Sequence, residues 1–257
     1  MYLKKSLSPE FKTRLKRKLE AVRAHFYKKD LSRIGQIFKT DKFEKHNYTP
    51  VYQKHFHPLR KKKINLLEIG VGGYKNPISG GNSLRMWKGY FRKAKIFAID
   101  IYDKEKLQEK RIKIFKGSQI DLNFLNHVYS EIGKLDIIID DGSHINEHVI
   151  TSFKFLFPKL NEQGIYVIED IQTSYWPEYG GSSLELNNPE TIMGFFKSLT
   201  DGLNHAELII PDYKASYLNL NIESIHFYHN MIFIYKGKNT KPSSYLINNQ
   251  LPEKLHE

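Results

Sequence analysis

The chain has 257 residues, of which 40% are hydrophobic and 26% are charged, and it contains no cysteine. This length suits one α/β domain with an appendage, and the composition is that of a globular protein. The lack of cysteine excludes disulfides and cysteine-ligated zinc or iron–sulfur sites. No apolar run is long enough to cross a membrane, and no secretory signal is visible after Met1, so we expect a cytoplasmic protein.

The positive charge is concentrated in residues 1–63. They hold 19 Lys/Arg and 5 Asp/Glu, a net charge of +14, whereas the rest of the chain holds 21 and 23, a net charge of −2. Ser8-Pro9 predicts a helix start, and the helix is expected to reach about Lys29. A solvated helix face would explain the charge, as would attraction to an anionic membrane, nucleic acid or acidic glycan. An apolar stripe at helical spacing favours a membrane surface or a partner subunit: Phe11, Leu15, Leu19, Val22 and Phe26.

From residue 64 onwards, apolar strands alternate with helices. Strands are predicted at 64–69, 96–100, 112–116, 136–140 and 165–168, and helices at about 84–92, 121–132, 146–159 and 189–199. Residues 224–237 are typical of a hairpin with His229-Asn230 near its turn. The pattern predicts an α/β fold: a Rossmann-like, doubly wound, mostly parallel sheet with a C-terminal antiparallel hairpin and an N-terminal helical segment. We expect a basic helical segment at 1–63, the main domain at 64–237 and a poorly ordered tail at 238–257.

The first strand runs into a glycine-rich turn, Gly70-Val71-Gly72-Gly73, and Ser83 is expected to cap the helix that follows. Glycines let a backbone approach a ligand closely. The dinucleotide pattern G-x-G-x-x-G is broken here, which favours a smaller nucleoside ligand. The second strand ends in Asp100, and an acid at that place is the usual partner of ribose hydroxyls.

Two later strands end in adjacent carboxylates. The first is followed by Asp140-Asp141-Gly142-Ser143-His144 and the second by Glu169-Asp170. Because the C-terminal ends of parallel strands lie at one edge of a sheet, we expect Asp141, His144, Glu169 and Asp170 to lie close together. Clustered carboxylates repel one another unless a cation lies between them, and all-oxygen ligands favour Mg²⁺.

A long loop, residues 171–188, follows the second carboxylate pair. Its position indicates a wall or lid for a substrate, and its aromatic rings could cover the C–H face of a sugar or simply pack. The substrate candidates are Gln172, Tyr175, Trp176 and Tyr179.

The stretch Leu67-Glu68-Ile69-Gly70-Val71-Gly72-Gly73 resembles motif I of the class I S-adenosylmethionine (SAM)-dependent methyltransferases. More narrowly, the chain resembles the metal-dependent sugar O-methyltransferases of macrolide biosynthesis, the mycinamicin VI and demethylmacrocin type, over residues 31–237. Four stretches carry this resemblance: Thr40-Asp41-Lys42 with Tyr48-Thr49-Pro50; Gly72-Gly73-Tyr74 with Gly80-Gly81-Asn82-Ser83-Leu84-Arg85-Met86-Trp87; Ile139-Asp140-Asp141-Gly142-Ser143-His144; and Val167-Ile168-Glu169-Asp170 with Gln172-Thr173-Ser174-Tyr175.

The resemblance implies an oligomeric enzyme that uses SAM and Mg²⁺. Asp141, Glu169 and Asp170 would bind the metal, and His144, beside Asp141, would be the general base. SAM would lie over Gly70 and Gly72. Its other contacts would be Asp100 at the ribose, Ser118 and Gln119 near the adenine, Thr40, Asp41 and Tyr48 at the methionine end across a subunit interface, and Glu68, Ser83 and Asp140 nearby.

Physical chemistry is consistent with such a reaction. The methyl group of SAM is electrophilic, so the protein has to align a nucleophilic oxygen behind it and remove a proton. A sugar hydroxyl has a very high pKa, which Mg²⁺ bound to two neighbouring hydroxyls would lower before His144 takes the proton. We therefore expect a vicinal diol on a glycan, glycolipid or glycosylated natural product.

Two other functions stay open at this point. The basic segment suggests an RNA-modifying methyltransferase, although no Asn-Pro-Pro-Tyr-like motif for base methylation occurs, so a nucleic-acid partner is not expected. A non-catalytic binding protein on the same fold is the other alternative, and the intact set of carboxylates and histidine argues against it. Hydroxylation is disfavoured because no facial triad with two histidines is evident.

Overall fold

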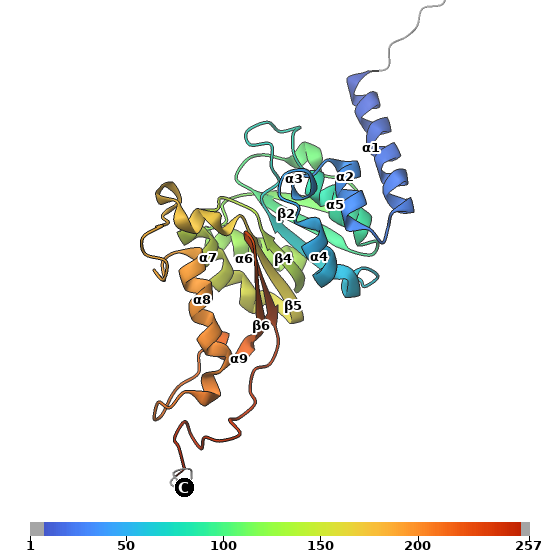
Figure 1. The fold of residues 1–257 in the computed structure, drawn as a ribbon. Helices are drawn as coiled ribbons and strands as arrows, with labels where there is room; N and C mark the ends of the chain where they lie inside the picture. Colours follow the sequence, from blue (N-terminus) through green and yellow to red (C-terminus); the bar gives the residue numbers. More distant parts are fainter. Residues whose placement is uncertain (1–7, 253–257) are drawn as a thin grey trace, which may run out of the picture.

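The computed structural model describes residues 8–252, apart from the side chains of Pro9, Glu10 and Arg14. These residues form a seven-stranded sheet in the order β3-β2-β1-β4-β5-β7-β6. Figure 1 shows the sheet as arrows with helices around it. Strands β1 to β5 run parallel, and β7 is antiparallel to both of its neighbours. This confirms the predicted sheet and hairpin. The strands are β1 Asn65–Ile69, β2 Lys95–Asp100, β3 Ile112–Lys116, β4 Leu135–Asp140, β5 Leu160–Glu169, β6 Ile222–Tyr228 and β7 Met231–Lys236.

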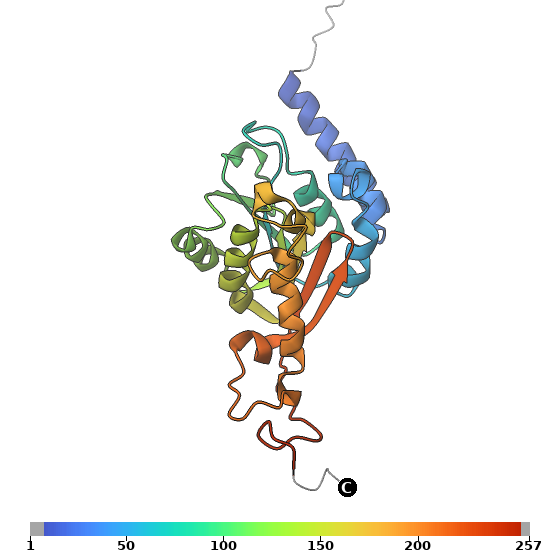
Figure 2. The same ribbon diagram turned by 60° about the vertical axis from the view of Figure 1, so that its left-hand side comes forward.

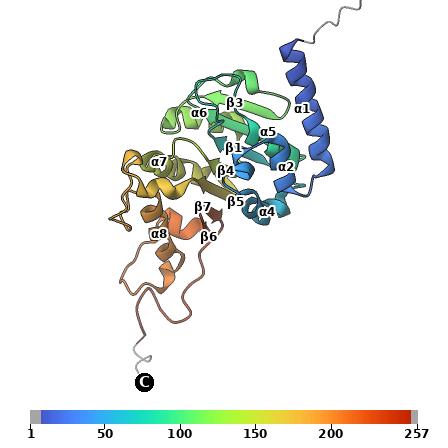
Figure 3. The same ribbon diagram turned by 45° about the horizontal axis from the view of Figure 1, so that its top comes forward.

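Helices cover both faces of the sheet (Figure 3). Helices α2, α4 and α5 pack on one face, and α6, α7 and α8 pack on the other. The helices are α1 Pro9–Phe26, α2 Leu31–Phe38, α3 Asp41–Glu44, α4 Thr49–Phe56, α5 Asn82–Tyr90, α6 Leu122–Ile132, α7 Asn146–Leu156, α8 Ile192–Leu203 and α9 Tyr217–Asn221.

The alternation of side chains along β4 explains why both faces need helices. Ile137 and Ile139 belong to the core under α2, α4 and α5, whereas Ile138 belongs to the core under α6, α7 and α8. All three side chains are fully buried. Successive residues of a strand point to opposite faces, so an unbroken apolar run requires cover on both sides.

Several predicted boundaries were wrong. Helix α5 begins at Asn82 with Gly81 as its N-cap, so Ser83 lies inside the helix rather than capping it. Strand β5 begins at Leu160, five residues before the predicted start, because a strand can continue past its apolar run. In the segment predicted as a tail, the Asn249 amide donates to the carbonyls of His205 and Leu208, just after α8, at 3.1 and 2.7 Å. Residues 253–257 lie outside the described residues.

The N-terminal segment has two structural roles. Helices α2 and α4, which periodicity did not predict, contribute Ile34, Tyr52 and Phe56 to the same core as the sheet. Helix α1 instead lies at the edge of the molecule and extends beyond it (Figures 1 and 2). Its stripe of five large apolar side chains is 44–79% exposed. Within residues 8–252, no helix has the length and apolar character needed to cross a membrane.

Candidate active site

The candidate site lies where β1, β4 and β5 end. The backbone N–H of Asp141, after β4, donates to the carbonyl of Ile69 at the end of β1 at 3.0 Å. Gly70 adopts φ +94°, and a Cβ there would lie 2.1 Å from the carbonyl oxygen of Asp141. Only glycine therefore lets the two loops approach this closely.

A cavity of about 230 Å³ opens in front of the glycine turn. Gly72 lies at φ +74°, and a Cβ placed on it would meet no atom within 4 Å, so its backbone faces open space. Asp100 fixes the turn, because its carboxylate accepts from the backbone N–H of Val71 at 2.9 Å and of Tyr102 at 2.8 Å. Of the predicted cofactor residues, the cavity is lined by Asp41, Gly70, Gly72 and Ser83.

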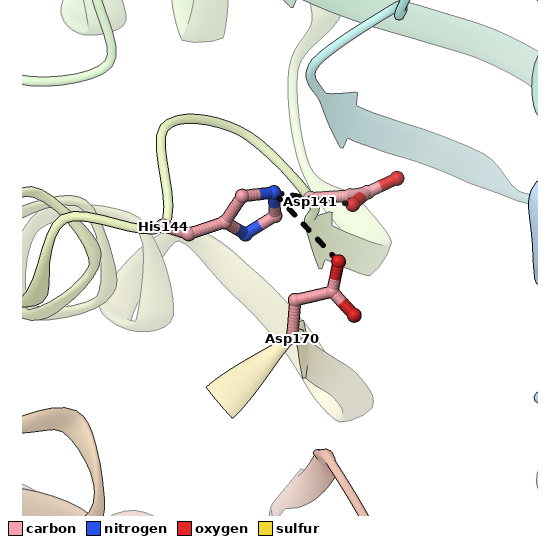
Figure 4. Close-up of side chains that lie close together, drawn as sticks. All are labelled: Asp141, His144 and Asp170. Carbon is pink, nitrogen blue, oxygen red and sulfur yellow. Dashed lines mark ion pairs between the residues drawn. The ribbon is translucent and has the colours of Figure 1, made fainter. Parts of the chain in front are cut away.

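Beside this cavity, Asp141, His144 and Asp170 converge (Figure 4). The His144 Nε2 lies 3.8 Å from Asp141 Oδ1 and 4.0 Å from Asp170 Oδ2. One ligand atom from each of the three residues lies within 4.8 Å of the others. His144 and Asp170 both adopt left-handed backbone conformations, φ +57° and +53°, which are uncommon for residues other than glycine and concentrate at functional sites. Two carboxylate oxygens and an imidazole nitrogen fit a divalent cation.

Glu169, the third predicted metal ligand, lies next to this group, and its carboxylate contacts the same Lys42 ammonium as Asp141. Its carboxylate is buried and accepts hydrogen bonds from the Lys42 ammonium at 2.6 Å and from the Tyr52 hydroxyl. Burial, and then the nearby charge of Asp141, raise the pKa of Glu169 well above its usual value, and Lys42 opposes the shift.

Lys42 is a fully buried cation among three carboxylates. Its Nζ lies 2.6 Å from Asp141 Oδ2, 2.6 Å from Glu169 Oε1 and 3.4 Å from Glu68 Oε1. Burial alone would lower the pKa of Lys42, but the three carboxylates outweigh it and raise the pKa well above its usual value. For Glu68, burial is the stronger effect and raises the pKa to about 7, even though Lys42 opposes it.

Helix α4 and the residue before it supply two tyrosines to the same carboxylates. The Tyr48 hydroxyl donates to Asp170 Oδ1 at 2.6 Å, and the Tyr52 hydroxyl donates to Glu169. In this structure Tyr48 thus contacts the carboxylate of its own chain. No role for Tyr52 or Lys42 was predicted from the sequence. Tyr48 and Tyr52 are four residues apart, a spacing that places two side chains on one helix face, and this was the signal that could have indicated Tyr52.

Gln119 and Asp140, predicted near the cofactor, form a buried network beneath the loop that carries Asp141. The Gln119 amide donates to Asp140 at 3.3 Å, and its oxygen accepts from the backbone N–H of Ser143 at 2.9 Å. The Ser152 hydroxyl of α7 donates to Asp140 at 2.8 Å. Burial raises the pKa of Asp140 to about 6, against the hydrogen bond from Ser152. Ser118 is half-buried, and Thr40 is buried with its hydroxyl 3.2 Å from Asp41.

Three of the predicted substrate residues lie on two short 3-10 turns, Ile171–Tyr175 and Pro177–Tyr179, and Trp176 joins the two turns. The Asn146 amide of α7 holds this loop by donating to the carbonyls of Thr173 and Tyr179. Trp176 is 46% exposed, and its ring centroid lies 5.9 Å from that of Tyr179. The buried Oε1 of Gln172 has no hydrogen-bond partner among the described residues, and Tyr175 is half-buried.

Comparison with known proteins identifies relatives of this chain. It is 46% identical over 214 residues to the mycinamicin VI 2''-O-methyltransferase of Micromonospora griseorubida, which corresponds to 82% of this chain and 54% of that protein. It is 44% identical over 202 residues to the 8-demethyl-8-alpha-L-rhamnosyl tetracenomycin-C 2'-O-methyltransferase of Streptomyces olivaceus, covering 78% of this chain and 53% of that one. No protein-family model matches.

A solved structure shares the fold. The MycE methyltransferase of the mycinamycin biosynthetic pathway, in complex with Mg, SAH and mycinamycin VI, superimposes with a TM-score of 0.79 at 45% identity, over 83% of this chain and 55% of that chain. The chain thus spans about half the length of the relatives it matches. By sequence and fold, over about four fifths of its own length, it is a homologue of the class I SAM-dependent methyltransferases of the mycinamicin VI and demethylmacrocin type.

Proposed function

We propose that this chain is a SAM- and Mg²⁺-dependent O-methyltransferase that methylates a hydroxyl of a sugar on a glycan, glycolipid or glycosylated natural product. One observation supports this most strongly: Asp141, His144 and Asp170 converge beside the cavity of the glycine turn. A nucleoside ligand at the turn would bring its reactive group to the side where these three residues lie.

In this proposal the residues have distinct roles. Gly70, Gly72, Asp41 and Ser83 line the cofactor cavity, and Asp100 holds the turn. The predicted contacts of Ser118, Gln119, Thr40, Glu68 and Asp140 with SAM stay predictions, and the hydrogen bonds of Gln119 and Asp140 indicate that these two support the site from beneath.

Asp141 and Asp170 would hold the divalent cation. When bound, the cation would supply Lewis acidity that lowers the pKa of a coordinated sugar hydroxyl. Glu169 stays in the proposed ligand set, but its contacts with Lys42 and Tyr52 would have to rearrange before it could contribute.

His144 lies within 4 Å of both aspartates and would take the proton from the acceptor hydroxyl. The acceptor would contact the loop that carries Gln172, Tyr175, Trp176 and Tyr179. Two neighbouring hydroxyls on one sugar would bind the cation, and one of them would give its proton to the base.

The test is calorimetric titration of S-adenosylhomocysteine (SAH) and of Mg²⁺ into the wild type and into Asp170→Asn. Asp170→Asn keeps the shape of the side chain and tolerates the left-handed backbone, but it removes a charged ligand. We expect SAH to bind both proteins equally, and Mg²⁺ affinity to fall about tenfold or more in the variant, in line with the loss of a charge-assisted contact of about 1.5–3 kcal/mol.

The matched control is Asp103→Asn, an aspartate outside the cluster whose carboxylate accepts a backbone N–H. Mg²⁺ affinity that is the same in all three proteins would contradict the metal assignment. Failure of SAH to bind the wild type would contradict the methyltransferase assignment itself and would favour a non-catalytic binding protein.

We also propose that the apolar stripe of α1 rests on an anionic membrane surface. The stripe is exposed, and the segment around it carries the charge excess of +14. Apolar burial and attraction to anionic lipid together give stable interfacial binding. Leu19→Glu should weaken co-sedimentation with phosphatidylglycerol vesicles about tenfold, because burying one leucine contributes about 1.5–3 kcal/mol.

Leu184→Glu, at a leucine that is 95% exposed in a distant loop, is the control and should leave vesicle binding unchanged. Equal binding of wild type and Leu19→Glu would overturn the proposal. A concentration-dependent dimer that the same substitution disrupts would instead identify a second copy of this chain as the occupant.

A further inference from the structure

A second cavity, of about 290 Å³, lies between α1 and α5, away from the metal cluster. Its walls carry five Lys/Arg side chains and one glutamate, a balance of +4 with His25 taken as neutral. They are formed by Arg17, Ala21 and His25 of α1, Phe38, Arg85, Lys88, Gly89, Arg92, Glu109 and Arg111. The proposed methyl transfer uses none of these side chains.

The positive groups of this cavity differ in how far they are already engaged. Arg111 donates to the carbonyls of Lys88, Phe91 and Ala94 at 2.8–3.0 Å, so it completes the end of α5. Lys88 pairs with Glu109 at 3.1 Å. Arg17 and Arg92, in contrast, have no hydrogen-bond or ion-pair partner within residues 8–252.

Arg85 is only partly engaged in hydrogen bonds. One of its terminal nitrogens donates to the Gly80 carbonyl and to Asn82 Oδ1, both at 2.8 Å. Burial, and then the neighbouring Arg17, lower the pKa of Arg85, whereas Glu109 and Glu20 oppose this shift. The fold therefore holds two guanidinium groups near each other at an electrostatic cost that a bound anion would offset.

Glu109 adds an independent observation. One of its oxygens pairs with Lys88, and the other, Oε1, is buried and accepts no hydrogen bond among the described residues. A buried acceptor without a donor is costly, and a ligand hydroxyl would satisfy it. A ligand for this cavity thus needs negative charge for the arginines and a hydroxyl for the glutamate.

We propose that this cavity binds a small phosphate ester that carries a hydroxyl group. Its phosphate would lie between Arg17, Arg85 and Arg92, because planar guanidinium groups bind phosphate oxygens in pairs. Its hydroxyl would donate to Glu109. The same chemistry occurs in a soluble polyol phosphate and in the headgroup of a phosphoglycerol lipid, and the position of the cavity under α1 is compatible with both sources.

The test compares Arg17→Gln with Arg23→Gln in the full chain. Both substitutions remove one arginine charge from α1, but Arg23 does not line this cavity. At constant ionic strength, glycerol 3-phosphate should bind the wild type and Arg23→Gln saturably, and Arg17→Gln about tenfold or more weakly. The ligand should raise the melting temperature of the wild type and of Arg23→Gln, but not that of Arg17→Gln. Unchanged SAH affinity in both variants would show that the fold is intact.

A second measurement distinguishes the two sources of the phosphate. If glycerol 3-phosphate does not bind, vesicles containing phosphatidylglycerol should bind Arg17→Gln markedly more weakly than Arg23→Gln, which would identify a lipid headgroup as the ligand. Equal losses in the two variants would mean unspecific charge attraction and would overturn the proposal. Absence of saturable binding in both measurements would overturn it as well.

Discussion

Replacing Lys42 with methionine is expected to lower the free energy of unfolding by about 3–5 kcal/mol, because removing one partner of a buried ion pair leaves its counter-charges uncompensated. Lys42 is fully buried, and its ammonium lies 2.6 Å from both Asp141 and Glu169. Methionine keeps the length and apolar stem of the side chain, so the change isolates the charge. Urea denaturation at neutral pH without divalent ions, followed by far-UV circular dichroism, measures the effect.

Mg²⁺ should restore part of this loss. Without the ammonium, Asp141 and Glu169 are free to accept a cation, and a ligand that binds only the folded state stabilises it. We therefore expect Mg²⁺ to stabilise Lys42→Met more than it stabilises the wild type. Lys45→Met, at an exposed lysine three residues away, is the control and should change stability by less than about 0.5 kcal/mol. A loss of the same small size in Lys42→Met would show that the buried contacts contribute little.

The sequence was enough to predict that Asp141, His144 and Asp170 meet. Each follows the C-terminal end of a parallel strand, and the ends of β4 and β5 are neighbours, with Asp140 paired to Ile168. Apolar runs that end in polar residues therefore specify both the sheet and the edge at which a site forms.

Side-chain alternation along the strands separates Glu169 from Asp140, the acid that ends β4. Glu169 has the same parity as Ile165 and Val167, whose side chains face α2, α4 and α5, and it meets Tyr52 of α4. Asp140 has the parity of Ile138, whose side chain faces the other helix layer, and it meets Ser152 of α7. Asp141, one residue after Asp140, returns to the face of Glu169, and both carboxylates contact the Lys42 ammonium at 2.6 Å.

The role of Lys42 could not be predicted from local sequence. Its neighbours are mostly polar, and a lysine in a basic segment is normally solvated. It is buried only because α3 places it over the ends of β1, β4 and β5, against acids that are 26, 99 and 127 residues away in the chain. Such pairing depends on the tertiary structure, and no periodicity within residues 31–63 signals it.

Replacing His144 with asparagine is expected to reduce the rate of methyl transfer by about 10²–10⁴, the usual contribution of a general base. Asparagine suits the left-handed backbone at φ +57°, whereas alanine would add backbone strain to the loss of the imidazole. The rate is measured under single-turnover conditions by mass spectrometry, with a glycoside that carries a vicinal diol as acceptor. Mg²⁺ and SAH affinities are measured on the same protein.

These binding measurements distinguish a base from a metal ligand, since His144 Nε2 is close enough to Asp141 and Asp170 for either role. If His144 is the base, His144→Asn should leave the Mg²⁺ affinity unchanged within about threefold. If His144 is a metal ligand, the same substitution should weaken Mg²⁺ binding more strongly. His46→Asn is the matched control, because the Nδ1 of His46 lies 3.7 Å from the same Asp170 carboxylate while its ring stacks on Tyr48. If His46→Asn slowed the reaction as much as His144→Asn, the proton would have to leave by the other side of Asp170, and the assignment of His144 as the base would be wrong.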